Sequence, residues 1–313
     1  MAPNLSLLAP IGLVLAVAAC TRSVTLTDVA DGGQRPREVV YRNVDGVRLK
    51  LYVFEPHTKA PARGRPAVVC IHGGGWNSGK PPFFFPHCRY FARRGVVAIS
   101  IGYRLEKKGA TTIADCLADC RAAIRFIRAR ADEVGIDPGR IAVVGDSAGG
   151  HLAACLGVGS GLSGERSPGV VRAEPDAMLL FNPVLDLTTK RWIERVQGAD
   201  PDRARSLSPL HLVASGQPPC LLMHGSADPV VPVEESRRFA DAMKKAGNHC
   251  DLIVLDGVAH AFVLAGYTAG DDVVVQSIRA ADAFLRSLGY LKGKPRLRAD
   301  RHRPVRTRLF DME

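Results

Sequence analysis

The sequence predicts an α/β protein with a mostly parallel central sheet and helices on both faces. Short apolar runs each end in glycine or polar residues, which is typical of strands buried on both sides. Stretches of helical periodicity separate these runs, and strand–helix–strand repeats favour parallel pairing. The 313 residues are 46% hydrophobic and 23% charged, enough for one large core. We therefore expect one folded domain over residues 38–290.

The first 20 residues, MAPNLSLLAPIGLVLAVAAC, have the apolar length of a signal-peptide core and are short for a membrane span with flanks. Small residues directly precede Cys20, which resembles the lipobox of bacterial lipoproteins, where the cysteine carries the lipid. An ordinary secretory signal is the alternative. Both interpretations predict an exported protein: anchored in the membrane through lipidated Cys20, periplasmic, or secreted. Residues 21–37 are expected to be a polar tether.

The elements of the domain follow in order along the chain. Residues 38–55 alternate around the turn signal Asp45-Gly46, which predicts an antiparallel hairpin. The later apolar runs predict strands within 66–74, 96–104, 140–147, 177–187, 220–228 and 251–260. The helical patterns predict helices over 84–94, 112–134, 148–157, 233–246 and 272–288. Functional groups of such sheets collect at the carboxyl ends of the strands, where each run has its polar residues.

The stretch GDSAGGH, residues 145–151, directly follows the apolar run IAVV. A strand that turns sharply into a helix needs small residues around the bend, and Gly145, Ala148 and Gly149 supply them. Such a turn exposes the hydroxyl of Ser147 and strains its backbone, which is the setting of a nucleophile. The sequence should then hold a base, an acid and an oxyanion site elsewhere.

A glycine run, IHGGGW at 71–76, follows the first of the predicted parallel strands. Three successive glycines let the backbone approach a substrate and direct N–H groups at it, and the Ala148 N–H at the start of its helix can join them. We expect an oxyanion site here, with His72 bracing the loop. His151 and His224 adjoin other motifs and are expected to be structural.

The candidates for the base and the acid lie C-terminal to Ser147 in the sequence. Of nine histidines, His260 follows the last predicted strand. Asp228 ends the penultimate strand and is the first candidate for the acid, with Asp186 and Asp256 as rivals. The order Ser, Asp, His along the chain is that of an elbow hydrolase and favours Asp228.

Together, HGGGW, GDSAGGH, HGSADPVVP and GVAHAF resemble the α/β-hydrolase superfamily. The similarity is to its esterase and lipase branch akin to hormone-sensitive lipase, and within it to acetyl-esterase and feruloyl-esterase-like proteins. The resemblance implies an α/β-hydrolase fold with a minimal cap, since only the connection 188–217 remains to cover the site. It assigns roles as follows: Ser147 nucleophile, Asp228 acid, His260 base, and Gly74, Gly75 and Ala148 oxyanion donors.

These residues predict a serine carboxylesterase acting on short-acyl esters, including acetyl groups on polysaccharide. Trp76 and Trp192 are candidate substrate contacts, although Trp192 could equally be a packing residue. The alternatives are an amidase, arylformamidase or peptidase with the same triad, and a non-catalytic binding protein on this scaffold. No organic cofactor is expected.

Charge and cysteine content bear on partners. Residues 292–308 hold eight Lys or Arg against one Asp and so supply +7 of the formal net charge of +11. We expect the tail 291–313 to be disordered and expect no nucleic-acid partner, since charge runs alone are weak evidence.

The eight cysteines include no CxxC pair, so no metal site is predicted. One disulfide, involving Cys88 or Cys250, stays open. The sequence does not predict the oligomeric state.

Overall fold

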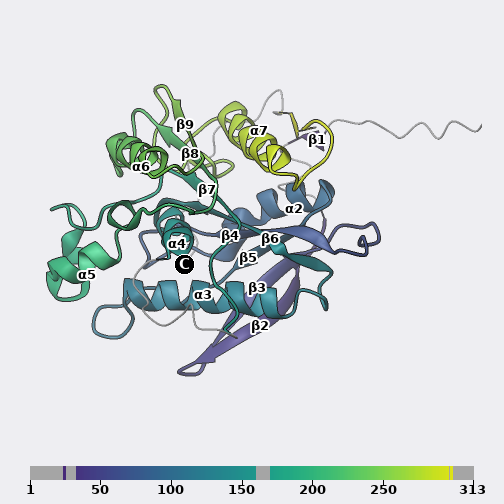
Figure 1. The fold of residues 1–313 in the computed structure, drawn as a ribbon, viewed down its shortest axis with the longest axis horizontal. Coiled ribbons are helices and arrows are strands. Elements are labelled where there is room, and N and C mark those ends of the chain that lie inside the picture. The colour runs from purple at the N-terminus through teal and green to yellow at the C-terminus, as the bar shows by residue number, and fades with distance from the viewer. Residues whose placement is uncertain (1–23, 26–32, 160–169, 296, 299–313) are drawn as a thin grey trace, which may run out of the picture.

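The computed structural model describes residues 24–25, 33–159, 170–295 and 297–298. Its centre is an eight-stranded sheet of order β2-β3-β5-β4-β6-β7-β8-β9 (Figure 1). The predicted hairpin is formed by β2 (Arg37–Val44) and β3 (Val47–Phe54), and β3 pairs antiparallel with β5. All other pairings are parallel, and they join β4 (Arg65–Ile71), β5 (Val97–Ile101), β6 (Ile136–Asp146), β7 (Ala177–Phe181), β8 (Cys220–Gly225) and β9 (Cys250–Leu255). The predicted fold class is confirmed.

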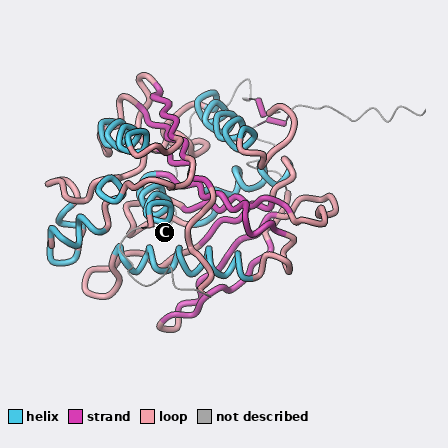
Figure 2. The backbone as a smooth tube through the Cα atoms, in the orientation of Figure 1, coloured by secondary structure: helices cyan, strands magenta, loops and turns pink. Residues whose placement is uncertain are grey.

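Helices cover both faces of this sheet (Figure 2). Strands β4, β5 and β7 are buried along their whole length, as continuous apolar runs predict. One apolar cluster joins the sheet to α3 (Ile113–Ala129), α4 (Ser147–Val158) and α6 (Val233–Lys245). A second cluster, on the opposite face, joins it to α2 (Phe85–Arg93) and α7 (Asp271–Ser287).

Two stretches differ from the prediction. The helix expected over 112–134 ends at Ala129, because the chain turns back through left-handed Gly135 (φ 64°) to enter β6. The connection 188–217, in which no element was expected, holds α5 (Pro201–Ser206), whose N-cap Asp200 accepts two backbone N–H groups. Asp followed by Pro is a helix-start signal that could have been recognised. Short 3₁₀ helices are η1 (Pro81–Phe84), η2 (Ile193–Arg195), η3 (Gln197–Ala199) and η4 (Pro209–Leu212).

Short parts of the predicted tether and tail form strands, and residues 291–295 of the tail are described as well. Strands β1 (Val24–Thr25) and β10 (Leu297–Arg298) pair in parallel as a separate two-stranded sheet. Leu297 is fully buried in the cluster under α7, and its carbonyl accepts a hydrogen bond from Arg279 Nε at 2.9 Å. A buried leucine, a side-chain hydrogen bond and pairing with β1 therefore hold this part of the tail.

The predicted signal peptide, including Cys20, lies outside the described residues. Within the described part of the chain, no helix has the length and apolarity needed to cross a bilayer.

The seven cysteines that the structure describes are free and buried. Cys70 Sγ and Cys88 Sγ lie 3.8 Å apart, well beyond the length of a disulfide bond, so Cys88 is not bonded to its neighbour. The described side chains include no group of three or more His, Cys, Asp or Glu placed to hold a metal ion.

Replacing Leu297 by Ala is expected to lower the free energy of unfolding by about 2–4 kcal/mol, since a buried leucine is lost from a packed cluster. Arg298→Ala, next to it and exposed, should change stability by less than about 0.5 kcal/mol. Urea denaturation followed by circular dichroism measures both. Equal stabilities of the two variants would show that the tail is not docked.

Candidate active site

Ser147 lies at a sharp turn between β6 and α4, as predicted. It is the first residue of α4, and its backbone is left-handed (φ 50°), which residues with a side chain rarely adopt. A Cβ on Gly145 would lie 2.3 Å from Gly149 O, and a Cβ on Gly149 would lie 2.1 Å from Ile71 O. Only glycine fits at both positions, so α4 approaches the end of β4 closely. This approach brings Ser147 beside residues 72–79, which we call the glycine loop.

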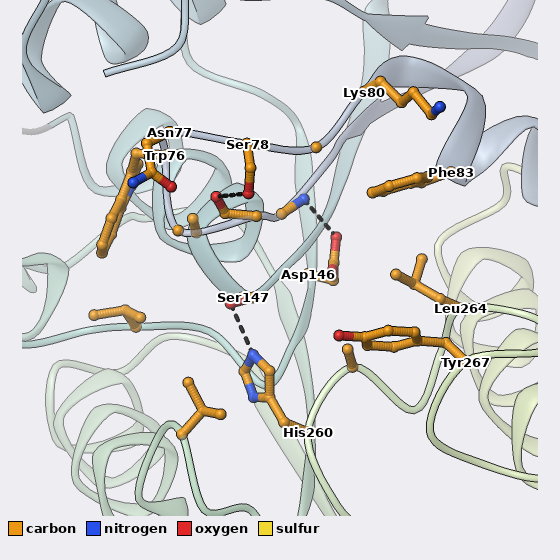
Figure 3. Close-up of a pocket in the computed structure, with 18 of the residues that line it drawn as sticks. Trp76, Asn77, Ser78, Lys80, Phe83, Asp146, Ser147, His260, Leu264 and Tyr267 are labelled. Carbon is orange, nitrogen blue, oxygen red and sulfur yellow. Dashed lines mark hydrogen bonds between the residues drawn. The ribbon is translucent and has the colours of Figure 1, made fainter. Parts of the chain in front are cut away.

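Three side chains from separate loops meet at this turn. His260 Nε2 lies 2.8 Å from Ser147 Oγ (Figure 3), and His260 Nδ1 lies 2.7 Å from Asp228 Oδ2. Asp228 follows β8 and His260 follows β9, so all three stand at carboxyl ends of parallel strands. The structure brings together the residues that the sequence selected as nucleophile, base and acid.

Asp228 is held on all sides. Its side chain is fully buried, and Oδ1 accepts the backbone N–H groups of Val230 and Val231. His224 Nε2 lies 3.1 Å from Asp228 Oδ2 and 3.0 Å from Val231 O. Desolvation alone would raise the pKa of Asp228, but the hydrogen bonds from His224, His260 and Val231 outweigh it and hold the pKa below its ordinary value. Asp228 therefore stays ionised and keeps the proton of neutral His260 on Nδ1, leaving Nε2 as the base.

The two rival acids lie elsewhere. Asp186 is bonded to His211 Nε2 at 3.1 Å and to Arg238 Nη1 at 3.2 Å. Asp256 is exposed and accepts a hydrogen bond from Ser226 Oγ at 3.0 Å. Both are accounted for by these contacts, which leaves Asp228 as the carboxylate bonded to His260.

The carbonyl groups of the glycine loop are held one after another. Tyr103 Oη donates to His72 O at 2.8 Å, and His72 Nδ1 donates to Gly73 O at 2.8 Å. Gly74 O accepts the Ser78 N–H at 2.9 Å and the Ser78 hydroxyl at 2.6 Å. Burial lowers the pKa of His72 to about 4, so its ring is neutral near pH 7. His72 thus braces the loop, as expected.

These bonds decide where the next amides point. In a planar trans peptide the C=O and N–H groups point in opposite directions, so holding the carbonyls of Gly73 and Gly74 turns the N–H groups of Gly74 and Gly75 away from them. Among the described residues neither amide has a hydrogen-bond partner. Ala148 N–H is in the first turn of α4, where a helix provides no acceptor. All three residues line the same cavity as Ser147 and can serve a developing oxyanion.

The structure adds a buried carboxyl that the sequence analysis did not single out. Asp146 directly precedes Ser147, is 2% exposed and lines the cavity. Its Oδ1 accepts the Gly73 N–H at 2.8 Å, which ties the turn at Ser147 to the glycine loop (Figure 3). Burial raises the pKa of Asp146 to about 6, against the opposing effects of the Gly73 N–H and of His260. A carboxyl directly after the apolar run IAVVG was the available sequence signal.

A cavity of about 600 Å³ opens at Ser147. Trp76 lines it but is fully buried, and its indole N–H donates to His151 Nδ1 at 3.1 Å. Trp192 stands edge-on to Trp76 with 5.8 Å between ring centres, and its indole N–H donates to Glu235 Oε1 at 3.2 Å. The two tryptophans are therefore rigid walls. The cavity also involves residues outside the quoted motifs: Phe83, Val184, Arg195, Leu264 and Tyr267.

A mostly parallel sheet with a serine elbow after β6, an acid after β8 and a histidine after β9 defines an α/β-hydrolase. Residues 51–243 match the BD-FAE family. The chain belongs to the BD-FAE family.

Curated relatives are named as ester hydrolases. Esterase LipQ of Mycobacterium tuberculosis is 31% identical over 75% of this chain and 58% of its own length. Ethyl acetate hydrolase of Pseudomonas putida is 29% identical over 71% of this chain and 74% of its own length. The chain spans about three fifths of the length of the first curated relatives, 58% of LipQ and 62% of esterase LipC.

Solved structures of Thermogutta terrifontis esterase 2 are similar over nearly their whole length. The form phosphorylated by paraoxon is 41% identical, with a TM-score of 0.75, over 83% of this chain and 96% of that one. The butyrate-bound form is 40% identical, with the same TM-score and the same shares of the two chains.

Asp228→Asn is expected to lower kcat on an activated ester by about 10³–10⁴, because an amide does not stabilise the imidazolium and favours the wrong tautomer of His260. Steady-state kinetics should show little change in KM. Asp256→Asn is the matched control and should keep the wild-type rate. The reverse pattern would assign the acid to Asp256.

Asp146 is expected to make the folded state less stable as pH rises. Its folded pKa of about 6 lies above its ordinary value of 3.8, so the native state binds the proton more tightly and the stability present below pH 4 is lost as pH passes 6. The two-unit difference corresponds to about 2–3 kcal/mol.

Asp146→Asn should remove this loss. Urea denaturation at pH 4.5 and pH 7.5 should therefore give a variant that gains stability relative to wild type as pH rises, whereas exposed Asp256→Asn should not. If the free energy of unfolding changed with pH in the same way in wild type and Asp146→Asn, the raised pKa of Asp146 would be contradicted.

Proposed function

We propose that the protein is a serine carboxylesterase that hydrolyses esters of short acyl groups. The observation that carries this proposal is the unbroken line of contacts from Asp228 through His260 to Ser147, at 2.7 and 2.8 Å. Unpaired amides stand beside the serine at the mouth of the cavity, which is the other requirement of acyl transfer.

The geometry supports a two-step reaction. His260 Nε2 takes the proton of Ser147 as Oγ attacks the ester carbonyl, and the carbonyl π electrons move onto the oxygen. The amides of Gly74, Gly75 and Ala148 stabilise that oxyanion. When it collapses, the bond to the alcohol breaks and His260 returns its proton to the leaving oxygen. Water then attacks the acyl-enzyme by the same route, which releases the acid and restores Ser147.

The acyl group is proposed to be short. The cavity of about 600 Å³ is bounded by the paired rings of Trp76 and Trp192, which hydrogen bonds hold in place. Similar structures of the Thermogutta esterase carry butyrate or propionate, and another relative is an ethyl acetate hydrolase. The paraoxon-phosphorylated form supports a reactive serine in this group of proteins.

For the alcohol part of the ester, we propose a hydroxyl group of a polysaccharide, so that the substrate is an acetylated glycan. The exposed rim of the cavity is polar, with Asn77, Ser78 and Lys80, which suits sugar hydroxyl groups. The predicted export signal, with or without lipidation of Cys20, supports a location where such glycans are met.

A series of p-nitrophenyl esters from acetate to decanoate tests the acyl preference. We expect kcat/KM to be highest between acetate and butyrate, and acetate to be released from acetylated xylan. Ser147→Ala should lower kcat by about 10⁵–10⁶, and Ser206→Ala, at a half-buried serine of α5 outside the cavity lining, should not. A preference for long chains would overturn the acyl proposal; intact xylan would overturn the glycan proposal.

A further inference from the structure

Arg195 connects the 188–217 connection to the glycine loop. It ends η2 and lines the cavity. Its Nη2 donates hydrogen bonds to Gly75 O and to Glu106 Oε2, the latter at 3.2 Å. Its guanidinium carbon lies 5.8 Å from the centre of the Trp76 ring. Three different groups of the site are therefore in contact with one side chain.

Gly75 O belongs to the peptide that lies between two left-handed residues of the loop, Gly75 and Trp76. Gly75 has φ 58° and Trp76 has φ 64°, and a tryptophan in this region persists only when its surroundings hold it there. The carbonyl before this peptide, Gly74 O, is held by Ser78, and the one after it, Trp76 O, accepts the Glu106 N–H at 2.8 Å. Arg195 supplies the remaining restraint, on the peptide in the middle.

We propose that Arg195 is a positioning residue for the oxyanion site, with Glu106 holding the guanidinium in place. By fixing the Gly75 carbonyl, Arg195 sets the backbone on the C-terminal side of the Gly75 amide, while Ser78 sets the other side. The amide is thereby aimed at the oxyanion before substrate binds. This inference rests on the esterase function proposed above.

The planar guanidinium is suited to this role because its N–H groups point in fixed directions. Nη2 binds a carbonyl and a carboxylate at once, and the Glu106 backbone returns to the same loop at Trp76 O. The result is a closed ring of contacts through Arg195, Glu106 and Trp76. The 188–217 connection thus supports the catalytic backbone, in addition to covering the cavity.

The test compares Arg195→Met, which keeps the aliphatic stem, with Glu106→Gln, which keeps the size of the side chain. Arg203→Met in α5 is the matched control, because Arg203 is exposed and its guanidinium bonds to Gln197 Oε1. We expect Arg195→Met to lower kcat on p-nitrophenyl acetate by about 10- to 100-fold with little change in KM. Glu106→Gln should have a smaller effect in the same direction.

A second readout separates positioning from a general loss of structure. Affinity for a short alkyl boronic acid, which forms a tetrahedral adduct with the serine, should fall by the same factor as kcat. Affinity for the product carboxylate should stay near that of wild type. If Arg195→Met does not fold, as judged by circular dichroism, Glu106→Gln carries the same comparison.

Unchanged kcat and boronate affinity in both variants would overturn the proposal. A rise in KM confined to esters that carry a carboxylate, with kcat unchanged, would also overturn it, because Arg195 would then bind substrate. A wild-type chain that hydrolyses no ester would refute the esterase function and this inference together, whereas an active wild type with active variants refutes only the inference.

Discussion

The close approach of α4 to the end of β4 is the contact on which the site depends. Gly149 leaves room for Ile71 O where any side chain would collide, and Gly145 leaves room for Gly149 O. This packing forces the left-handed turn at Ser147 and places the serine beside the glycine loop. This backbone contact therefore sets the nucleophile against the loop that carries the oxyanion donors, and the packing of α4 between sheet and connection offsets the strain of the turn.

Two aspartates of the site have buried side chains and yet have opposite pKa shifts. The Asp228 carboxylate accepts hydrogen bonds from two histidines and two backbone N–H groups. These donors stabilise its negative charge, so its pKa falls. Asp146 accepts the Gly73 N–H, but desolvation prevails and its pKa rises to about 6. Deeper burial and fewer donors make Asp146 a carboxyl that can take up a proton near neutral pH, whereas Asp228 remains an anion that orients His260.

The cavity is built from parts of the chain with different kinds of restraint. The glycine loop is held by hydrogen bonds to its carbonyls, and the tryptophan walls are held through their indole N–H groups by His151 and Glu235. His151 in turn bonds to Leu207 O in the 188–217 connection. The 188–217 connection therefore supports the site directly, because it contacts both the glycine loop and His151 beside the tryptophan walls.

The sequence alone determined the fold class, the succession of strands and helices along the chain, Ser147 and His260, and Asp228 as the first candidate for the acid, because strand burial and sharp turns impose local patterns on the chain. Only the tertiary structure decided which aspartate reaches the histidine, how Asp146 joins the glycine loop, that Leu297 docks under α7, and that Arg195 contacts Gly75. These contacts join residues far apart in the chain. Their geometry depends on how the loops fold over the sheet. Periodicity and turn signals are local, so they do not specify which loop residues meet.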